Sequence, residues 1–258
     1  LVLREALTAD SIQGLVYLIF AIAKMATVAI LLGSSLLSIR FLPQFGWKKG
    51  LLFSFFHSIS AFGNCGLDLF GNFQSLSAYA DDYLVCGTIA TLFIFGSLGF
   101  TVVLDIFQKK EMARYALHSK IVLVVTAFLL IFATLLIFCL EKSNPITLGG
   151  LTGGGKLFRA FFTAAASRTV GFSVVPAAAL SPGSLFLIMF LMFIGASPAS
   201  TGGGVKTTTI ALIFGTARAL LTGSDEVVFG GKRIPSSLVL KAFTITVLSL
   251  SLVFLVIF

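Results

Sequence analysis

Apolar stretches that could each cross a lipid bilayer recur along this chain. The hydrocarbon core of a bilayer is ~30 Å thick, and an α-helix needs ~20 residues to cross it. Five stretches reach this length, at 14–37, 83–106, 121–140, 184–220 and 237–258. Hydrophobic residues make up 57% of the 258 positions and charged residues only 11%, which is outside the range of soluble domains. We therefore predict an all-α integral membrane protein.

Two parts of the chain repeat each other. The segments GLLFSFFHSISAFGNCGLDLF (50–70) and GKLFRAFFTAAASRTVGFSVV (155–175) match at an offset of 105 residues, the separation of Gly66 and Gly171. The identical positions are Gly50/Gly155, Leu52/Leu157, Phe53/Phe158, Phe56/Phe161, Ala61/Ala166 and Gly66/Gly171. Their spacing is typical of one helix face followed by a glycine turn. Since each copy lies between two apolar stretches, the repeating unit is a span, a short helix, a glycine-containing loop and a second span.

The short helix of each unit, predicted at 47–62 and at 156–167, is too brief to cross a bilayer and too apolar to lie in water. Each should enter the membrane and return through the next loop, 63–68 or 168–173. Irregular backbone at membrane depth is tolerated where it lines a water-filled path, and its carbonyls can replace the hydration shell of an ion. Two surface turns after buried helices are the alternative. The candidate ion-binding residues are Asn64, Cys65, Gly66, Thr169, Val170 and Gly171.

The stretch 184–220 is too long for one crossing, so it must be interrupted. Its middle, GASPASTGGGVKTTT (195–209), contains a proline and three consecutive glycines that disfavour a helix. An irregular intramembrane segment with a lysine marks a binding element or a gate. A glycine-rich cytosolic loop between two full spans does not fit, because 184–194 and 207–220 are each about half a span. The candidate gating residues are Gly195, Ala196, Ser197, Pro198, Ala199, Ser200, Thr201, Gly202, Gly203, Gly204 and Lys206.

Three motifs occur in order along the chain: SISAFGNCGLDLF (58–70), SRTVGF (167–172) and GASPASTGGGVKTTT (195–209). Together they resemble the Ktr/Trk/HKT superfamily of potassium transporters, most closely its KtrB-like membrane subunits. The resemblance implies four repeated units around one pore, in a pseudo-fourfold, potassium-channel-like architecture with one characteristic glycine in each filter. It also implies that this chain holds units two and three and the start of unit four, as part of a longer protein.

The repeat and the resemblance divide the chain into six parts. These are a cytoplasmic linker (1–13), a second pore unit (14–106), a cytoplasmic loop (107–120), a third pore unit (121–221), a cytoplasmic loop (222–236) and the first span of a fourth unit (237–258). Lys and Arg are more frequent in 107–120 and 218–241 than in the opposite loops, which places these segments in the cytoplasm. The predicted location is the bacterial inner membrane, with several crossings.

Two charged residues flank the predicted filter loops. Arg168 precedes Thr169, and because a cation facing a K+ site would repel the ion, its guanidinium is expected to point away and hold the loop backbone. A position at the outer membrane interface is the competing interpretation. Asp68 follows Gly66, where a carboxylate could raise the cation concentration at a pore mouth or could be an ordinary solvated loop acid.

The resemblance implies K+ as the transported ion and dependence on Na+ in some members. It further implies a homodimer of the full-length protein and a cytosolic KtrA-like regulatory ring that binds ATP or ADP. Within this chain, Gly150, Gly155 and Lys156 match G-x-x-x-x-G-K, but Leu157 replaces the Ser or Thr that binds magnesium, so we expect no bound nucleotide. The net charge of +8 lacks aromatic-basic interleaving, so we expect contact with the lipid bilayer and none with nucleic acid.

Two other functions are compatible with the same residues. A secondary transporter could bind a small solute at the broken helix. An intramembrane enzyme could use Ser197 as a nucleophile, but its only histidines, His57 and His118, lie on a predicted pore helix and in a charged loop. We therefore predict no enzymatic activity and no catalytic residue.

Overall fold

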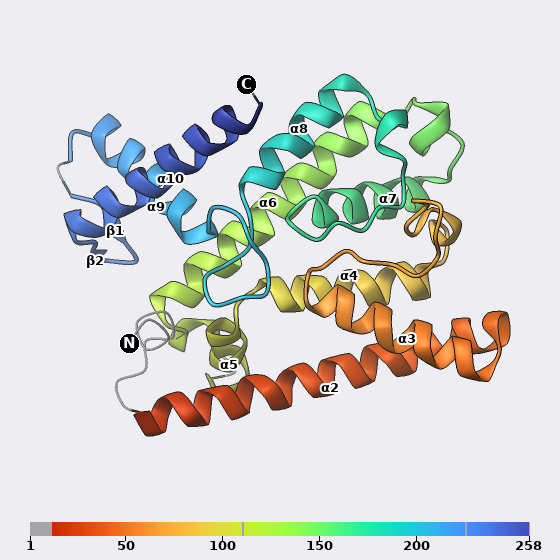
Figure 1. Cartoon of the computed structure of the whole chain (residues 1–258). Coiled ribbons are helices and arrows are strands. Elements are labelled where there is room, and N and C mark those ends of the chain that lie inside the picture. The colour runs from red at the N-terminus through yellow and green to blue at the C-terminus, as the bar shows by residue number, and fades with distance from the viewer. Residues whose placement is uncertain (1–11, 110, 225, 258) are drawn as a thin grey trace.

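The structure is a computed structural model that describes residues 12–109, 111–224 and 226–257 (Figure 1). Most of the linker predicted at 1–13 lies outside these ranges, and its last two residues belong to the first helix. Within the described ranges, the chain is helical apart from loops and one short hairpin, which confirms the predicted fold class. Three of these helices are long and apolar enough to cross a membrane, and a bent pair could form a fourth crossing.

The predicted second pore unit begins with two helices that pack side by side (Figure 1). α2 (Ile12–Phe45) ends where Gly46, with a φ of 75°, reverses the chain. α3 (Trp47–Phe62) then covers the residues expected to form the first short helix. It approaches α2 closely at Gly50, where an added Cβ would lie 2.8 Å from the Leu42 Cα atom.

A long loop leads from α3 to α4 (Tyr83–Ser97) and contains the 3-10 turn η1 (Ser77–Tyr79). Asp82 caps α4, because its Oδ1 atom accepts hydrogen bonds from the backbone N–H groups of Leu84 and Val85, both at 3.1 Å. The start of α4 is therefore fixed by a side chain.

A continuous span over 83–106 was expected, and this prediction is wrong. α5 (Phe100–Lys109) follows α4 almost directly but is bent away from it by 96°. Gly99 lies at the break with a φ of 92°, a conformation open mainly to glycine. Apolar residues continue on both sides of the break, which made the stretch look uniform. α5 and the 3-10 turn η2 (Met112–Arg114) therefore occupy part of the loop predicted at 107–120.

The predicted third pore unit has the same order of elements. α6 (Leu117–Glu141) is followed by the π-helical turn η3 (Pro145–Gly149). α7 (Gly153–Ala166) comes next and begins three residues before the predicted short helix at 156–167. It lies beside α6, as α3 lies beside α2 (Figure 1).

The second half of this unit is interrupted, as the sequence predicted. After the turn η4 (Ala177–Ala179), α8 (Pro182–Phe193) starts with Ser181 as its cap and proline in its first turn. α8 stops after 12 residues, and α9 (Thr207–Leu221) begins beyond an irregular segment. Neither helix alone is long enough to cross a bilayer.

A hairpin in the second predicted cytoplasmic loop was not anticipated. β1 (Val228–Phe229) pairs with β2 (Lys232–Arg233) in antiparallel orientation. Phe229 packs over Gly215 of α9, where an added Cβ would lie 2.5 Å from its ring. α10 (Ser236–Ile257) then packs beside α9 (Figure 1).

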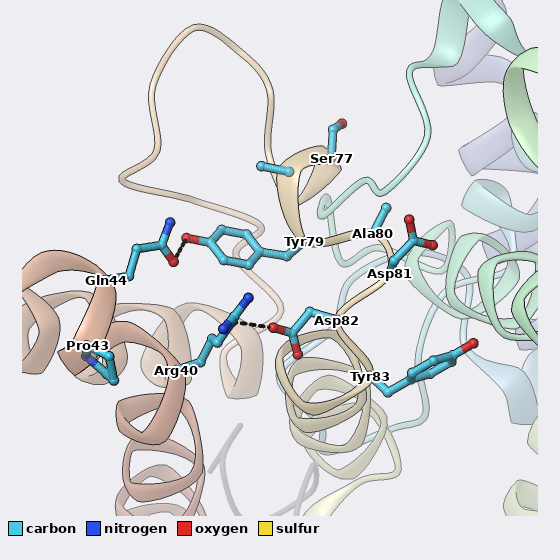
Figure 2. A pocket seen from close by; sticks show the side chains of 10 residues that line it. Arg40, Pro43, Gln44, Ser77, Tyr79, Ala80, Asp81, Asp82 and Tyr83 are labelled. Carbon is cyan, nitrogen blue, oxygen red and sulfur yellow. Dashed lines mark hydrogen bonds and ion pairs between the residues drawn. The ribbon is translucent and has the colours of Figure 1, made fainter.

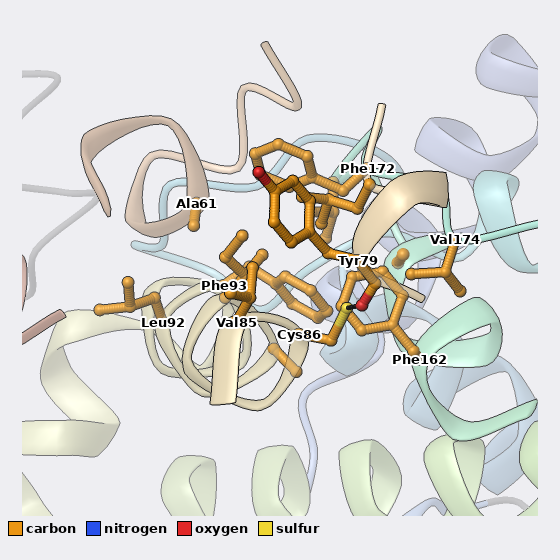
Figure 3. Packing of buried hydrophobic residues seen from close by; sticks show 14 of the residues in the cluster. Ala61, Tyr79, Val85, Cys86, Leu92, Phe93, Phe162, Phe172 and Val174 are labelled. Carbon is orange, nitrogen blue, oxygen red and sulfur yellow. Dashed lines mark hydrogen bonds between the residues drawn. The ribbon is translucent and has the colours of Figure 1, made fainter. Parts of the chain in front are cut away.

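The largest buried cluster joins the two predicted pore units (Figure 3). It combines Phe93 of α4 with Phe162 of α7 and with Phe172 and Val174 of the loop that follows α7. The rings of Phe93 and Phe162 meet edge to face, with centroids 5.7 Å apart. The core therefore lies directly behind the loop predicted at 168–173.

Candidate functional site

The two loops predicted to form an ion filter share one backbone pattern. Asn64 and Gly66 have φ angles of 51° and 65°, and Thr169 and Gly171 have φ angles of 62° and 94°. Asparagine and glycine enter this left-handed region readily, but a β-branched threonine rarely does. The repeat in the sequence is therefore also a repeat in the backbone. Thr169 is held in an unfavourable conformation, which is a feature of functional sites.

The loops meet at their glycines. A Cβ atom added to Gly66 would overlap the Val170 carbonyl oxygen and would lie 2.6 Å from the Gly171 Cα atom. A Cβ atom added to Gly171 would lie 3.1 Å from the Gly66 Cα atom. Residues that are far apart in the sequence thus come together, and at Gly66 only glycine fits without moving the opposite backbone.

A cavity of about 470 Å³ lies beside this contact. Two side-chain oxygens here, Asn64 Oδ1 and Thr169 Oγ1, are buried and have no hydrogen-bond partner among the described residues. Buried polar atoms are normally paired, so these oxygens are available to a ligand. Five of the six predicted ion-binding residues line the cavity: Asn64, Cys65, Thr169, Val170 and Gly171.

The segment 195–206 folds back on itself between α8 and α9. The Gly195 N–H donates to the Val205 carbonyl at 3.0 Å, which joins the two ends of the segment. The Lys206 Nζ atom donates to the Gly202 carbonyl at 2.7 Å, so the ammonium group is bound within the same segment. The interruption of the span is therefore a defined fold.

This segment packs against the beginnings of both loops, 63–68 and 168–173. Asn64 Nδ2 donates to Thr201 Oγ1 at 2.5 Å, and Thr201 Oγ1 donates to the Phe62 carbonyl at 3.0 Å. A Cβ atom added to Gly202 would lie 3.0 Å from Thr169 Oγ1. Any movement of the segment must therefore change the surroundings of both loops.

The same segment is hydrogen-bonded to the break between α4 and α5. Three backbone bonds make this connection: Ser197 N to Ser97 O (3.1 Å), Thr201 N to Gly96 O (3.2 Å) and Phe100 N to Ala199 O (2.8 Å). They satisfy groups that the helix ends would leave unpaired. Sequence reasoning missed this contact because it treated the stretch 83–106 as one helix.

Arg168 is buried, with 4% of its surface exposed, which argues against a position at the membrane interface. Its guanidinium donates to the Gly195 carbonyl at 3.0 Å. We expected it to hold the backbone of its own loop, but within the described ranges no such bond is found. The arginine instead joins the end of α7 to the start of the segment 195–206.

The polar groups at the site are mostly neutral oxygens. Asp68 is the last residue of the loop 63–68 and accepts a hydrogen bond from the Phe70 N–H at 3.0 Å. Across the residues that the structure describes, no group of three His, Cys, Asp or Glu side chains is placed to hold a metal ion. Carbonyl, amide and hydroxyl oxygens suit a hard monovalent cation that exchanges its water shell for them.

Comparison with protein families matches residues 11–258 to the TrkH model, described as a cation transport protein. The chain belongs to the TrkH family. The resemblance carried by the three sequence motifs is thereby confirmed. Members of this family are integral membrane proteins, in agreement with the apolar helices of this chain.

Curated TrkH-family relatives from bacteria cover nearly all of this chain. Ktr system potassium uptake protein B of Bacillus subtilis is 38% identical over 258 residues, which are 100% of this chain and 58% of the relative. Potassium/sodium uptake protein NtpJ of Enterococcus hirae is 38% identical over 252 residues, which are 98% of this chain and 55% of the relative. The chain therefore spans somewhat more than half the length of these relatives.

A solved structure has the same fold. The crystal structure of the potassium transporter TrkH from Vibrio parahaemolyticus superposes with a TM-score of 0.65 at 19% sequence identity. The match covers 83% of this chain and 45% of that chain. The arrangement of spans and short helices in this chain is thus the arrangement of part of a TrkH fold.

Proposed function

We propose that this chain forms part of the cation path of a bacterial Ktr-type K+ uptake system, as a KtrB-like membrane subunit. The observation that carries the proposal is the repeated left-handed backbone of the loops 63–68 and 168–173, which meet at Gly66 and Gly171. The names of the curated relatives support K+ as the transported ion.

In this proposal, backbone carbonyls in both loops bind dehydrated K+. In an extended strand successive carbonyls point to opposite sides, whereas alternation of left- and right-handed residues turns them toward one side. Cys65 and Val170 each lie between two left-handed residues, which supports such an alternation. These loops would supply half of a fourfold ring, and the other half would come from the rest of the full-length protein. Asp68 would stand at the mouth.

The segment 195–206 would act as the gate. Its contacts with Asn64 and Thr169 support this role, because they place it directly against the filter loops. Its glycine-rich backbone can take a second path at little cost in strain. Lys206, bound to the Gly202 carbonyl, would place a positive charge near the path until the segment moves.

Partners follow from the same proposal. The full-length protein would form a homodimer in the inner membrane and would be controlled by a cytosolic KtrA-like ring that binds ATP or ADP. The phrase "Ktr system" in the names of relatives supports a second component, and the potassium/sodium name of one relative supports Na+ dependence. The exposed turn η2 and hairpin β1–β2 offer cytoplasmic surfaces for docking.

Growth of a bacterium that lacks its own K+ transporters tests the function. The complete protein containing this chain should restore growth at limiting K+, and added NaCl should change the rate if Na+ is coupled. If the cells fail to grow although the protein is present in the membrane, the proposed K+ uptake function is refuted. Uptake of a small solute by the same cells would instead favour the secondary transporter. The Ser197 hydroxyl offers no support for an enzyme, because its partner is the Thr207 hydroxyl at 3.3 Å.

A further inference from the structure

Two adjacent carboxylates at the start of α4 point in opposite directions (Figure 2). Asp82 pairs with Arg40 of α2, with 2.8 Å between Oδ2 and Nε, so this pair lies within the predicted second unit. Asp81 turns away from Arg40, and its Oδ1 atom lies 2.7 Å from the NH2 atom of Arg159 on α7. This second pair crosses from one unit to the other.

Arg159 is well placed to hold α7 in position. Its side chain is 16% exposed, and its NH1 atom also donates to the Thr147 carbonyl at 3.3 Å. One guanidinium therefore joins α7 both to the turn η3 of its own unit and to Asp81 of the other unit. Because a guanidinium is planar with fixed donor directions, such a double contact restricts both sliding and rotation of the helix.

The aromatic contacts that α7 makes with the second unit are less directional. Phe158 packs against Tyr83 with ring centroids 4.8 Å apart, and Phe162 packs against Phe93 one turn further along α7. Aromatic contacts of this kind tolerate small shifts. The contact made by Arg159 therefore fixes a position that the aromatic packing alone leaves adjustable.

A second connection between the units lies at the end of the loop 168–173. The Ser173 N–H donates to Ser75 Oγ at 3.0 Å, and the Ser173 carbonyl accepts from the Leu76 N–H at 2.9 Å. The outer loop of the second unit thus holds the exit of the third unit's filter loop, while Asp81 holds the helix that leads into it.

We propose that the Asp81–Arg159 pair is a positioning pair that sets how the two filter loops face each other and thereby tunes preference for K+ over Na+. α7 leads directly into the loop 168–173, so a small shift of α7 moves Gly171. At Gly66 the opposing backbone already lies at contact distance, so the shift must change the ion site. This inference rests on the proposed K+ path.

The experiment is a double-mutant cycle in the complete protein, reconstituted in liposomes. The variants are Asp81→Asn, Arg159→Gln and both together, with Arg40→Gln as the matched control that breaks the neighbouring pair within one unit. The ratio of K+ to Na+ flux is measured for each. We expect each single variant to lower this ratio about threefold, the range of a partly exposed ion pair, while Arg40→Gln leaves it unchanged.

Because the two side chains act through one contact, the double variant should lose no more than Arg159→Gln alone. Three results would each overturn the proposal. These are a flux ratio in the double variant that falls by the product of the two single losses, a loss in Arg40→Gln equal to that of the single variants, and an unchanged ratio in both single variants. If Arg159→Gln fails to fold, Asp81→Asn decides alone, since the Asp81 side chain is 71% exposed. If the wild-type protein transports no K+, the proposed function itself is refuted. If the wild-type protein transports K+ and the variants give one of the three results above, only the role of the Asp81–Arg159 pair is refuted.

Discussion

Replacing Gly66 by alanine should reduce K+ preference more than the same replacement at Gly171. Both residues have positive φ, so both variants carry the conformational cost of a left-handed L-residue. They differ in their neighbours. The new methyl group at 66 would overlap the Val170 carbonyl oxygen, whereas at 171 its nearest neighbour is the Gly66 Cα atom at 3.1 Å. The methyl group of Gly66→Ala must therefore displace the Val170 carbonyl, a predicted ion-binding group. The methyl group of Gly171→Ala needs the Gly66 backbone to shift by only a few tenths of an ångström.

The left-handed conformation costs an alanine about 1–2 kcal/mol, which corresponds to roughly 5- to 30-fold in an equilibrium. We therefore expect Gly171→Ala to lower the ratio of K+ to Na+ flux by at most about 30-fold. Gly66→Ala should lower this ratio further than Gly171→Ala does, because the overlap is relieved only if the backbone of the other loop moves.

Gly71 provides the matched control. Its φ is 79°, and an added Cβ would meet no atom within 4 Å, so Gly71→Ala carries the conformational cost without the overlap. The assay is the ratio of K+ to Na+ flux into proteoliposomes containing the complete protein, with melting temperature measured alongside. Gly71→Ala should lower the melting temperature and leave the ratio unchanged. Equal flux ratios in all three variants, or a larger loss at 171 than at 66, would refute the reasoning.

Three further predictions concern the segment 195–206 and the fold. Deletion of Ser200–Gly204 should raise unregulated cation flux and also lower K+ preference, because it removes Thr201 and Gly202, which contact the loops that hold Asn64 and Thr169; unchanged flux with normal nucleotide control would show that the segment is not a gate. A disulfide between Gly99→Cys and Ser197→Cys, where the Cβ separation would be 3.6 Å, should reduce flux until a reductant is added; the new Cβ at 99 would also lie 2.5 Å from the Pro198 carbonyl oxygen, so Gly99→Cys alone carries the same backbone displacement and serves as the control that should not respond to reductant. Glu141→Gln should destabilise the protein by about 2–3 kcal/mol, because the fully buried carboxylate accepts several hydrogen bonds, and Glu111→Gln at an exposed pair should cost under about 0.5 kcal/mol. Equal melting temperatures of these last two variants would contradict the argument.

Sequence patterns predicted correctly those elements that are determined by residues close to one another in the chain. The helix Trp47–Phe62 follows from its apolar face and from glycines at both ends. The interruption of 184–220 follows from a length that no single crossing needs and from Pro198 with three glycines. The two loops with the repeated left-handed backbone were located because two copies of one pattern carry more information than either copy alone.

Contacts between distant segments could not be found in this way. The break before α5 depends on backbone bonds from the segment 195–206, about a hundred residues later, and Gly99 is its only local sign. The bond from Arg168 to the Gly195 carbonyl likewise depends on how the two units fold together. A usable signal was nevertheless present, because the offset that pairs Gly66 with Gly171 also pairs Gly99 with Gly204, and both of these glycines have positive φ.

This last pairing changes how the intramembrane segment is understood. Both units interrupt their second span near the same register, over residues 98–99 in the second unit and over the longer irregular stretch 194–206 in the third. The two interruptions are joined by three backbone hydrogen bonds, two to the end of α4 at Gly96 and Ser97 and one to the start of α5 at Phe100. The segment 195–206 therefore cannot leave its place unless the two bonds to α4 break, while the third bond persists only if α5 moves with the segment. In the proposed orientation, a force on the cytoplasmic side can reach the segment through α9, which follows it directly, or through α5. The Gly99–Ser197 disulfide distinguishes the two cases. If the segment moves away from α5, as the predicted loss of flux assumes, the cross-link holds it closed, and if it moves with α5, the cross-linked protein still opens.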